Sequence, residues 1–137
     1  MPLDVSELIG GALGGAIVSS IVAPLVTQRL DRRQSRAEVL RAIAAVERSR
    51  WGHIERDQFL NAVIALRSAA LVAGARRELT DRYIELCEQA RSESEAGFET
   101  SGVPEDGSIS RALVRSVSDA AEALVEHVWH PWRTWRP

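Results

Sequence analysis

The chain has 137 residues and a formal net charge of −2, with 45% hydrophobic and 26% charged residues. A chain of this length has room for one folded domain beside a membrane anchor, and not for two domains. Its single cysteine, Cys87, excludes an intrachain disulfide. The slightly acidic balance argues against nucleic acid as a partner.

The first notable segment is the apolar stretch over residues 8–26, which carries no charged side chain. A helix of about 20 apolar residues, rising about 1.5 Å per residue, crosses the hydrocarbon core of a bilayer. The glycines of this stretch would each weaken a helix in water by about 1 kcal/mol. In hydrocarbon the backbone groups must pair within the segment, so that penalty is overridden. We therefore expect one transmembrane helix, within an anchor over residues 1–28.

Small residues recur every four positions in this stretch, at Gly11, Gly15, Ser19 and Ala23. Such a spacing gives a helix a narrow face, along which two membrane helices can approach closely. The pattern predicts a homo-oligomer that associates through these four residues.

The charges around the stretch predict its orientation. Acidic residues precede it, whereas Arg29, Arg32, Arg33 and Arg36 follow it at once. Positive charge is retained on the cytoplasmic side, so we expect an outside N-terminus and a cytoplasmic C-terminal domain at the inner (cytoplasmic) membrane. The same four arginines are candidate contacts for anionic lipid head groups.

Residues 29–130 are expected to form an all-α domain, a small antiparallel helical bundle. Apolar residues recur at steps of three and four, and we find no alternating strand pattern. Residues 54–73 are the most apolar and are predicted to be the core helix, with Gly74 as its C-terminal cap. The other expected helices cover residues 27–50, residues 78–96, and the segment from Ser108 (as N-cap) to Trp129, with a loop over residues 97–107.

The C-terminal tail, residues 131–137, is rich in tryptophan and arginine. Both residue types favour the membrane interface, and both dominate protein–protein contact sites. Trp129, Trp132 and Trp135 are therefore candidate anchors on a membrane or on a partner protein. Packing of Trp129 and Trp132 against the end of the bundle is the alternative.

The sequence predicts no catalytic, cofactor or metal site. Cys87 lies on an apolar stripe, where a cysteine usually acts as a small buried hydrophobic residue. Glu122, Glu126 and His130 share a helical face, but Pro131 ends that helix at once. We therefore expect the chain not to be an enzyme.

Three functions remain open from the sequence. The favoured one is a non-enzymatic, membrane-anchored interaction or scaffold protein, with a cytoplasmic or membrane protein as partner. The second is a small membrane-active protein that forms pores or lesions, as phage-encoded proteins can. The third is a soluble helical oligomer with residues 8–26 in its core.

Overall fold

The computed structural model describes residues 30–101 and 109–133. Within these ranges the chain is all-α, with four helices and no strand. None of the helices described there has both the length and the apolar character needed to cross a membrane. The predicted span over residues 8–26, with Gly11, Gly15, Ser19 and Ala23, lies outside the described residues.

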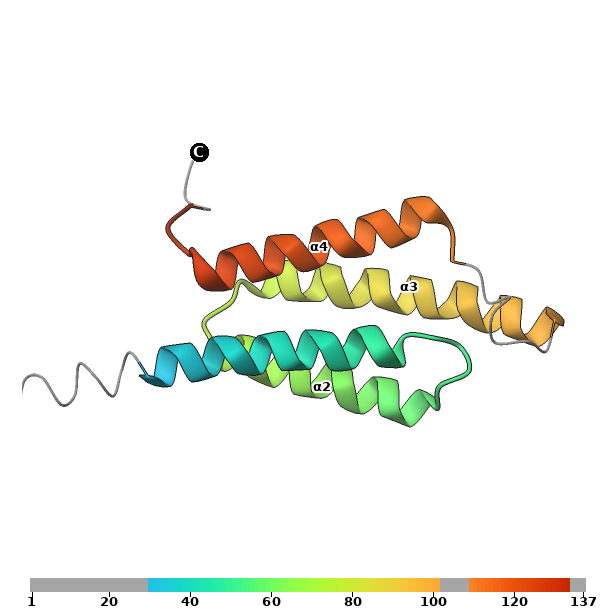
Figure 1. Ribbon diagram of the computed structural model, residues 1–137, viewed down its shortest axis with the longest axis horizontal. Coiled ribbons are helices and arrows are strands. Elements are labelled where there is room, and N and C mark those ends of the chain that lie inside the picture. Colours follow the sequence, from blue (N-terminus) through green and yellow to red (C-terminus); the bar gives the residue numbers. More distant parts are fainter. Residues whose placement is uncertain (1–29, 102–108, 134–137) are drawn as a thin grey trace, which may run out of the picture. The chain divides into compact units, whose positions relative to one another are not determined.

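The chain divides into two compact units, residues 1–34 and residues 35–137. Residues 30–49 are helical, and this helix belongs to the second unit from Ser35 on. Three more helices follow in the second unit: α2 (Arg56–Val72), α3 (Arg77–Ser101) and α4 (Arg111–Trp129). Successive helices of this unit run in opposite directions, which confirms the predicted helical bundle (Figure 1).

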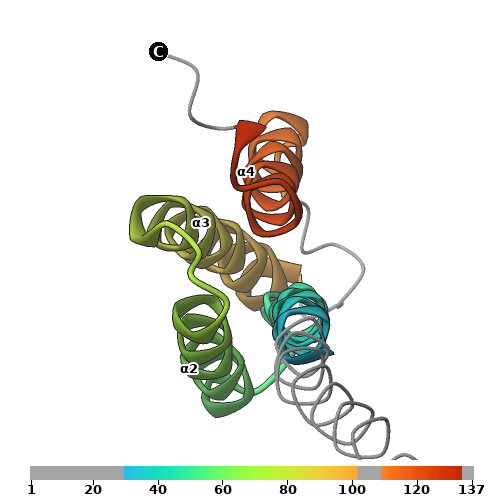
Figure 2. The same cartoon turned by 90° about the vertical axis from the view of Figure 1, so that its left-hand side faces the viewer.

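Each helix contributes one apolar stripe to a shared core. Side chains three or four positions apart lie on one face of a helix, and these faces form one shared core. Figure 2 shows the helices of this unit end-on. The principal core residues are Val39, Ile43, Val46, Phe59, Val63, Leu66, Tyr83, Ile84, Cys87, Val117, Leu124 and Val128.

The prediction that residues 54–73 form the core helix is wrong in detail. Large apolar side chains of α2 point to solvent, with exposed fractions of 62% for Ile64, 81% for Leu71 and 75% for Val72. The inner face of α2 still reaches the core, where Leu66 is as fully buried as Tyr83 and Cys87 of α3. Helix α2 has apolar side chains around most of its circumference, so its sequence does not reveal which face is buried.

The end of α2 follows the prediction. Gly74 has a positive φ of 71°, a conformation that glycine adopts without a steric penalty. The Gly74 amide donates to the Leu71 carbonyl at 3.1 Å, and the Ala75 amide donates to the Ala70 carbonyl at 2.9 Å. These two bonds form a Schellman motif, which satisfies the last carbonyls of the helix.

The boundaries of the next two helices differ from those expected. Helix α3 continues to Ser101, so the first part of the predicted 97–107 loop is helical. One internal glycine costs a helix only about 1 kcal/mol, and Gly97 alone does not end α3. The N-cap of α4 is Ser110 in place of Ser108, and its hydroxyl accepts from the Leu113 amide at 3.4 Å. The predicted end at Trp129 is confirmed.

Candidate functional site

The predicted anchor residues Arg36 and Trp129 meet at one end of the bundle. The guanidinium carbon of Arg36 lies 5.3 Å from the centre of the Trp129 ring, within the range of a cation–π contact. Trp129 is half-buried, and this contact holds it against the start of the second unit. Of the other predicted lipid contacts, Arg32 and Arg33 are exposed, and Arg29 lies outside the described residues.

Trp132 lies beyond the end of α4 and is 65% exposed. Its ring meets the ring of His130 edge-on, with 5.5 Å between the ring centres. The neighbouring Arg133 lies 3.4 Å from a carboxylate oxygen of Glu126. Trp132 is thus held close to the bundle and leaves most of its ring accessible, whereas Trp135 lies outside the described residues.

His127, on the last turn of α4, connects this end to the α2–α3 turn. Its side chain is buried, and burial together with the positive charge of Arg76 lowers its pKa. Arg76 belongs to the turn that joins α2 to α3. Within residues 30–101 and 109–133, no three His, Cys, Asp or Glu side chains lie close enough to hold a metal ion.

A half-open pocket of about 280 Å³ lies between the end of α2 and the start of α3. Ala70, Leu71 and Ala75 form much of its apolar lining. At its rim, Arg67 and Arg77 each lie 3.4 Å from a carboxylate oxygen of Asp81. All three side chains are substantially exposed, and ion pairs of this kind contribute only about 0–1 kcal/mol.

At the opposite end of the bundle, buried Arg91 holds the turn between the 30–49 helix and α2. One guanidinium nitrogen donates to the carbonyl oxygens of Ser49 (2.8 Å) and Trp51 (3.2 Å). The other terminal nitrogen donates to the Ile54 carbonyl at 2.7 Å. The inner nitrogen, Nε, lies 2.7 Å from a carboxylate oxygen of Glu95. Arg91 therefore hydrogen-bonds to the backbone carbonyl oxygens of the turn, and the Glu95 carboxylate neutralises the charge of Arg91.

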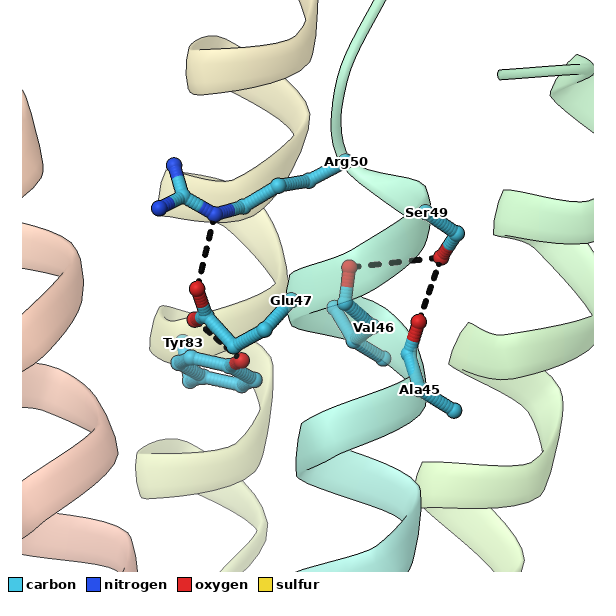
Figure 3. A network of polar contacts seen from close by, with 6 residues as sticks. All are labelled: Ala45, Val46, Glu47, Ser49, Arg50 and Tyr83. Atoms are coloured by element: carbon cyan, nitrogen blue, oxygen red, sulfur yellow. Dashed lines mark hydrogen bonds and ion pairs between the residues drawn. The ribbon is translucent and has the colours of Figure 1, made fainter.

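A second polar network joins the 30–49 helix to α3. The Glu47 carboxylate accepts from the Tyr83 hydroxyl and from Nε of Arg50, each at 2.8 Å (Figure 3). Burial, followed by the nearby Cys87 and Glu47, raises the pKa of Tyr83 far above its ordinary value. The phenol therefore stays protonated and acts as a fixed hydrogen-bond donor.

Cys87 is buried beside this network. Burial is the largest cause that raises the pKa of its thiol, to about 12. The thiolate is the nucleophilic form of cysteine, so this residue is inert near neutral pH. The structure places Cys87 in the core, as its sequence position predicts.

Sequence reasoning missed both polar networks. The available signal for Arg91 was its position, because Tyr83, Cys87 and Arg91 follow one another at steps of four on the buried face of α3. A charged residue in such a series must be neutralised and hydrogen-bonded inside the fold. No family model, curated protein or solved structure matches the chain.

Proposed function

We propose that the chain is a non-enzymatic, membrane-anchored helical module that self-associates and presents its bundle to a partner protein in the cytoplasm or membrane. One observation carries this proposal: the charge-free apolar stretch over residues 8–26 is followed at once by arginines and leads directly into a folded bundle. In this proposal the apolar stretch is the membrane anchor, the arginines are its positively charged cytoplasmic flank, and the bundle is the cytoplasmic domain.

The chemistry of the buried polar groups supports a structural role for the bundle. Arg91 is engaged by the backbone of one turn, and Glu47 is engaged by Tyr83 and Arg50. The Cys87 thiol has a pKa raised to about 12, which does not suit a nucleophile. These groups hold helices together and leave the outer faces of the bundle for binding.

The anchor is tested by fractionation of cells that express the full chain. We expect the protein in the membrane fraction, retained after alkaline extraction and released by detergent. Protease added to inverted vesicles should cleave the bundle, whereas protease added to intact spheroplasts should not. Recovery in the soluble fraction without detergent would reject the anchor and favour the soluble oligomer.

Self-association is tested by enlarging the small residues of the expected span. Gly11→Ile and Gly15→Ile should lower the oligomeric state in detergent, because a branched side chain keeps two helix backbones apart. Ser20→Ile is the matched control, since Ser20 belongs to a different face of an ideal helix from Gly15. An oligomeric state that is unchanged in both glycine variants would remove this face from the proposal.

A further inference from the structure

The most exposed large apolar side chains of the described residues gather at one end of the bundle. Leu71 and Val72, in the last turn of α2, are 81% and 75% exposed, and Trp132, just beyond α4, is 65% exposed. Figure 1 shows the end of α2 and the end of α4 at the same end of the bundle. Seen end-on in Figure 2, α3 lies between α2 and α4, so the two segments share this end of the bundle on either side of α3. We call Leu71, Val72 and Trp132 the apolar tip.

Two exposed arginines lie beside residues of the apolar tip: Arg77 lines the same pocket as Leu71, and Arg133 follows Trp132 in the sequence. The side chain of Arg77 is 85% exposed and that of Arg133 is 67% exposed. Their ion pairs with Asp81 and Glu126 are 3.4 Å long, and such exposed pairs exchange readily with other anions. Exposed apolar and aromatic side chains beside arginines are typical of protein segments at a membrane surface.

The chain also enters the bundle at this end. Arg36, the second residue of the unit, contacts Trp129 on the last turn of α4. Eight residues separate Val26, the end of the expected span, from Ser35, the start of the unit. Residues 30–34 of this segment are helical, so it reaches about 12 Å if it is helical throughout and at most about 18 Å if its first three residues are extended. A membrane anchor would therefore hold this end of the bundle close to the bilayer.

The exposed fractions of the apolar side chains along α2 indicate that a bilayer, and not a second copy of the chain, covers the apolar tip. The exposed fraction rises toward the tip, from 41% at Leu60 through 62% at Ile64 to 81% at Leu71. Arg67, which is paired with Asp81, interrupts the apolar stripe between Ile64 and Leu71. A second copy that packed along α2 would need an apolar stripe over the whole length of the helix. A bilayer at the end of the bundle needs apolar side chains only at the tip.

We propose that the apolar tip enters the interfacial region of an anionic bilayer and that Arg77 and Arg133 bind lipid phosphates, so that the bundle stands upright on the membrane. This inference rests on the proposed membrane anchor. The apolar tip would attach the bundle to the bilayer at a second place, in addition to the anchor. This second contact would fix the orientation of the bundle, with the turn at its other end, residues 50–55, facing the cytoplasm.

The test uses the full chain with one added cysteine, either Leu71→Cys or the matched control Ile64→Cys, labelled with an environment-sensitive fluorophore. Both positions are exposed on α2, so both variants should fold. The native chain is the labelling control, because its only cysteine is buried. Each protein is reconstituted into vesicles of phosphatidylcholine with phosphatidylglycerol, some of which carry a spin-labelled lipid as quencher.

We expect the lipid quencher to reduce the fluorescence at position 71 at least about threefold more than at position 64, because quenching falls off steeply over the ~10 Å that separate these residues along a helix. In vesicles of phosphatidylcholine alone, quenching at position 71 should fall, because the arginines lose their anionic partners.

Flotation separates the two possible failures. If the protein floats with the vesicles but position 71 is quenched no more than position 64, the anchor stands and the upright docking is wrong. If both positions are shielded from water without lipid quenching, a second copy covers α2 and the docking is also wrong. If the protein does not float, the proposed anchor fails and the docking fails with it.

Discussion

The guanidinium carbon of Arg36 lies 5.3 Å from the centre of the Trp129 ring, so the start of the second unit is fastened to the last turn of its last helix. These residues are 93 positions apart in the sequence. The contact brings the segment that follows the arginine-rich flank to the same end of the bundle as the exposed ring of Trp132. The start of the second unit and the C-terminal end of α4 therefore lie at one end of the bundle.

We predict that Arg36 and Trp129 stabilise the bundle jointly. In a double-mutant cycle of Arg36→Gln and Trp129→Leu, the coupling energy should be about 0.5–1 kcal/mol, because a partly exposed cation–π contact has this magnitude. Urea unfolding of the full chain in mild detergent, followed by circular dichroism, measures it. The matched cycle pairs Arg48→Gln with Trp129→Leu, since Arg48 is exposed on the same helix. Equal coupling in both cycles would contradict a specific contact.

The sequence predicted an all-α bundle because the apolar stripes of its helices are regular, whereas it left open how many helices residues 5–74 form. It also predicted Gly74 as a cap, since glycine has a distinct conformational role there. It could not predict the burial of α2, because residues such as Ile64 and Phe59 are both apolar although only Phe59 is buried. Polar contacts such as Arg91 with Ser49 join residues 42 positions apart and depend on the packing itself.

We predict that Arg91→Lys strongly destabilises the bundle. Arginine reaches three carbonyl groups of the turn at once, and the single ammonium of lysine cannot reproduce this geometry. Hydrogen bonds from a charged donor contribute about 1.5–3 kcal/mol, and we expect a loss of about 3 kcal/mol in the free energy of unfolding. Arg82→Lys is the matched control, because Arg82 is exposed on α3 and should lose less than about 0.5 kcal/mol. Similar losses in both variants would refute the role of Arg91.

We predict that Gly52→Ala is more destabilising than Gly74→Ala, although only Gly74 has a positive φ. A methyl group on Gly52 would lie 2.5 Å from the backbone nitrogen of Glu95, and backbone cannot move aside as a flexible side chain can. Overpacking of this kind costs about 1–3 kcal/mol, and we expect the upper end of that range. A methyl group on Gly74 meets nothing within 4 Å, so only the left-handed conformation opposes it, at about 1 kcal/mol. Urea unfolding of both variants checks the order, and the reverse order would show that the turn at Gly52 does not pack tightly on α3.

We predict that His127 makes the bundle less stable in mild acid. Burial and the charge of Arg76 lower the pKa of this side chain in the folded state, below the ordinary value of 6.5. The unfolded chain therefore binds the proton more readily, and the free energy of unfolding should decrease as the pH falls below about 6.5 toward the lowered pKa. His127→Gln removes this titration, so its stability should change less between pH 8 and pH 5.5 than that of the native chain. His53→Gln is the control for the loss of a histidine, because His53 is exposed to water in the folded chain. An NMR titration in which the His127 imidazole takes up its proton above pH 6.5 would contradict this explanation, because stability would then increase as the pH falls.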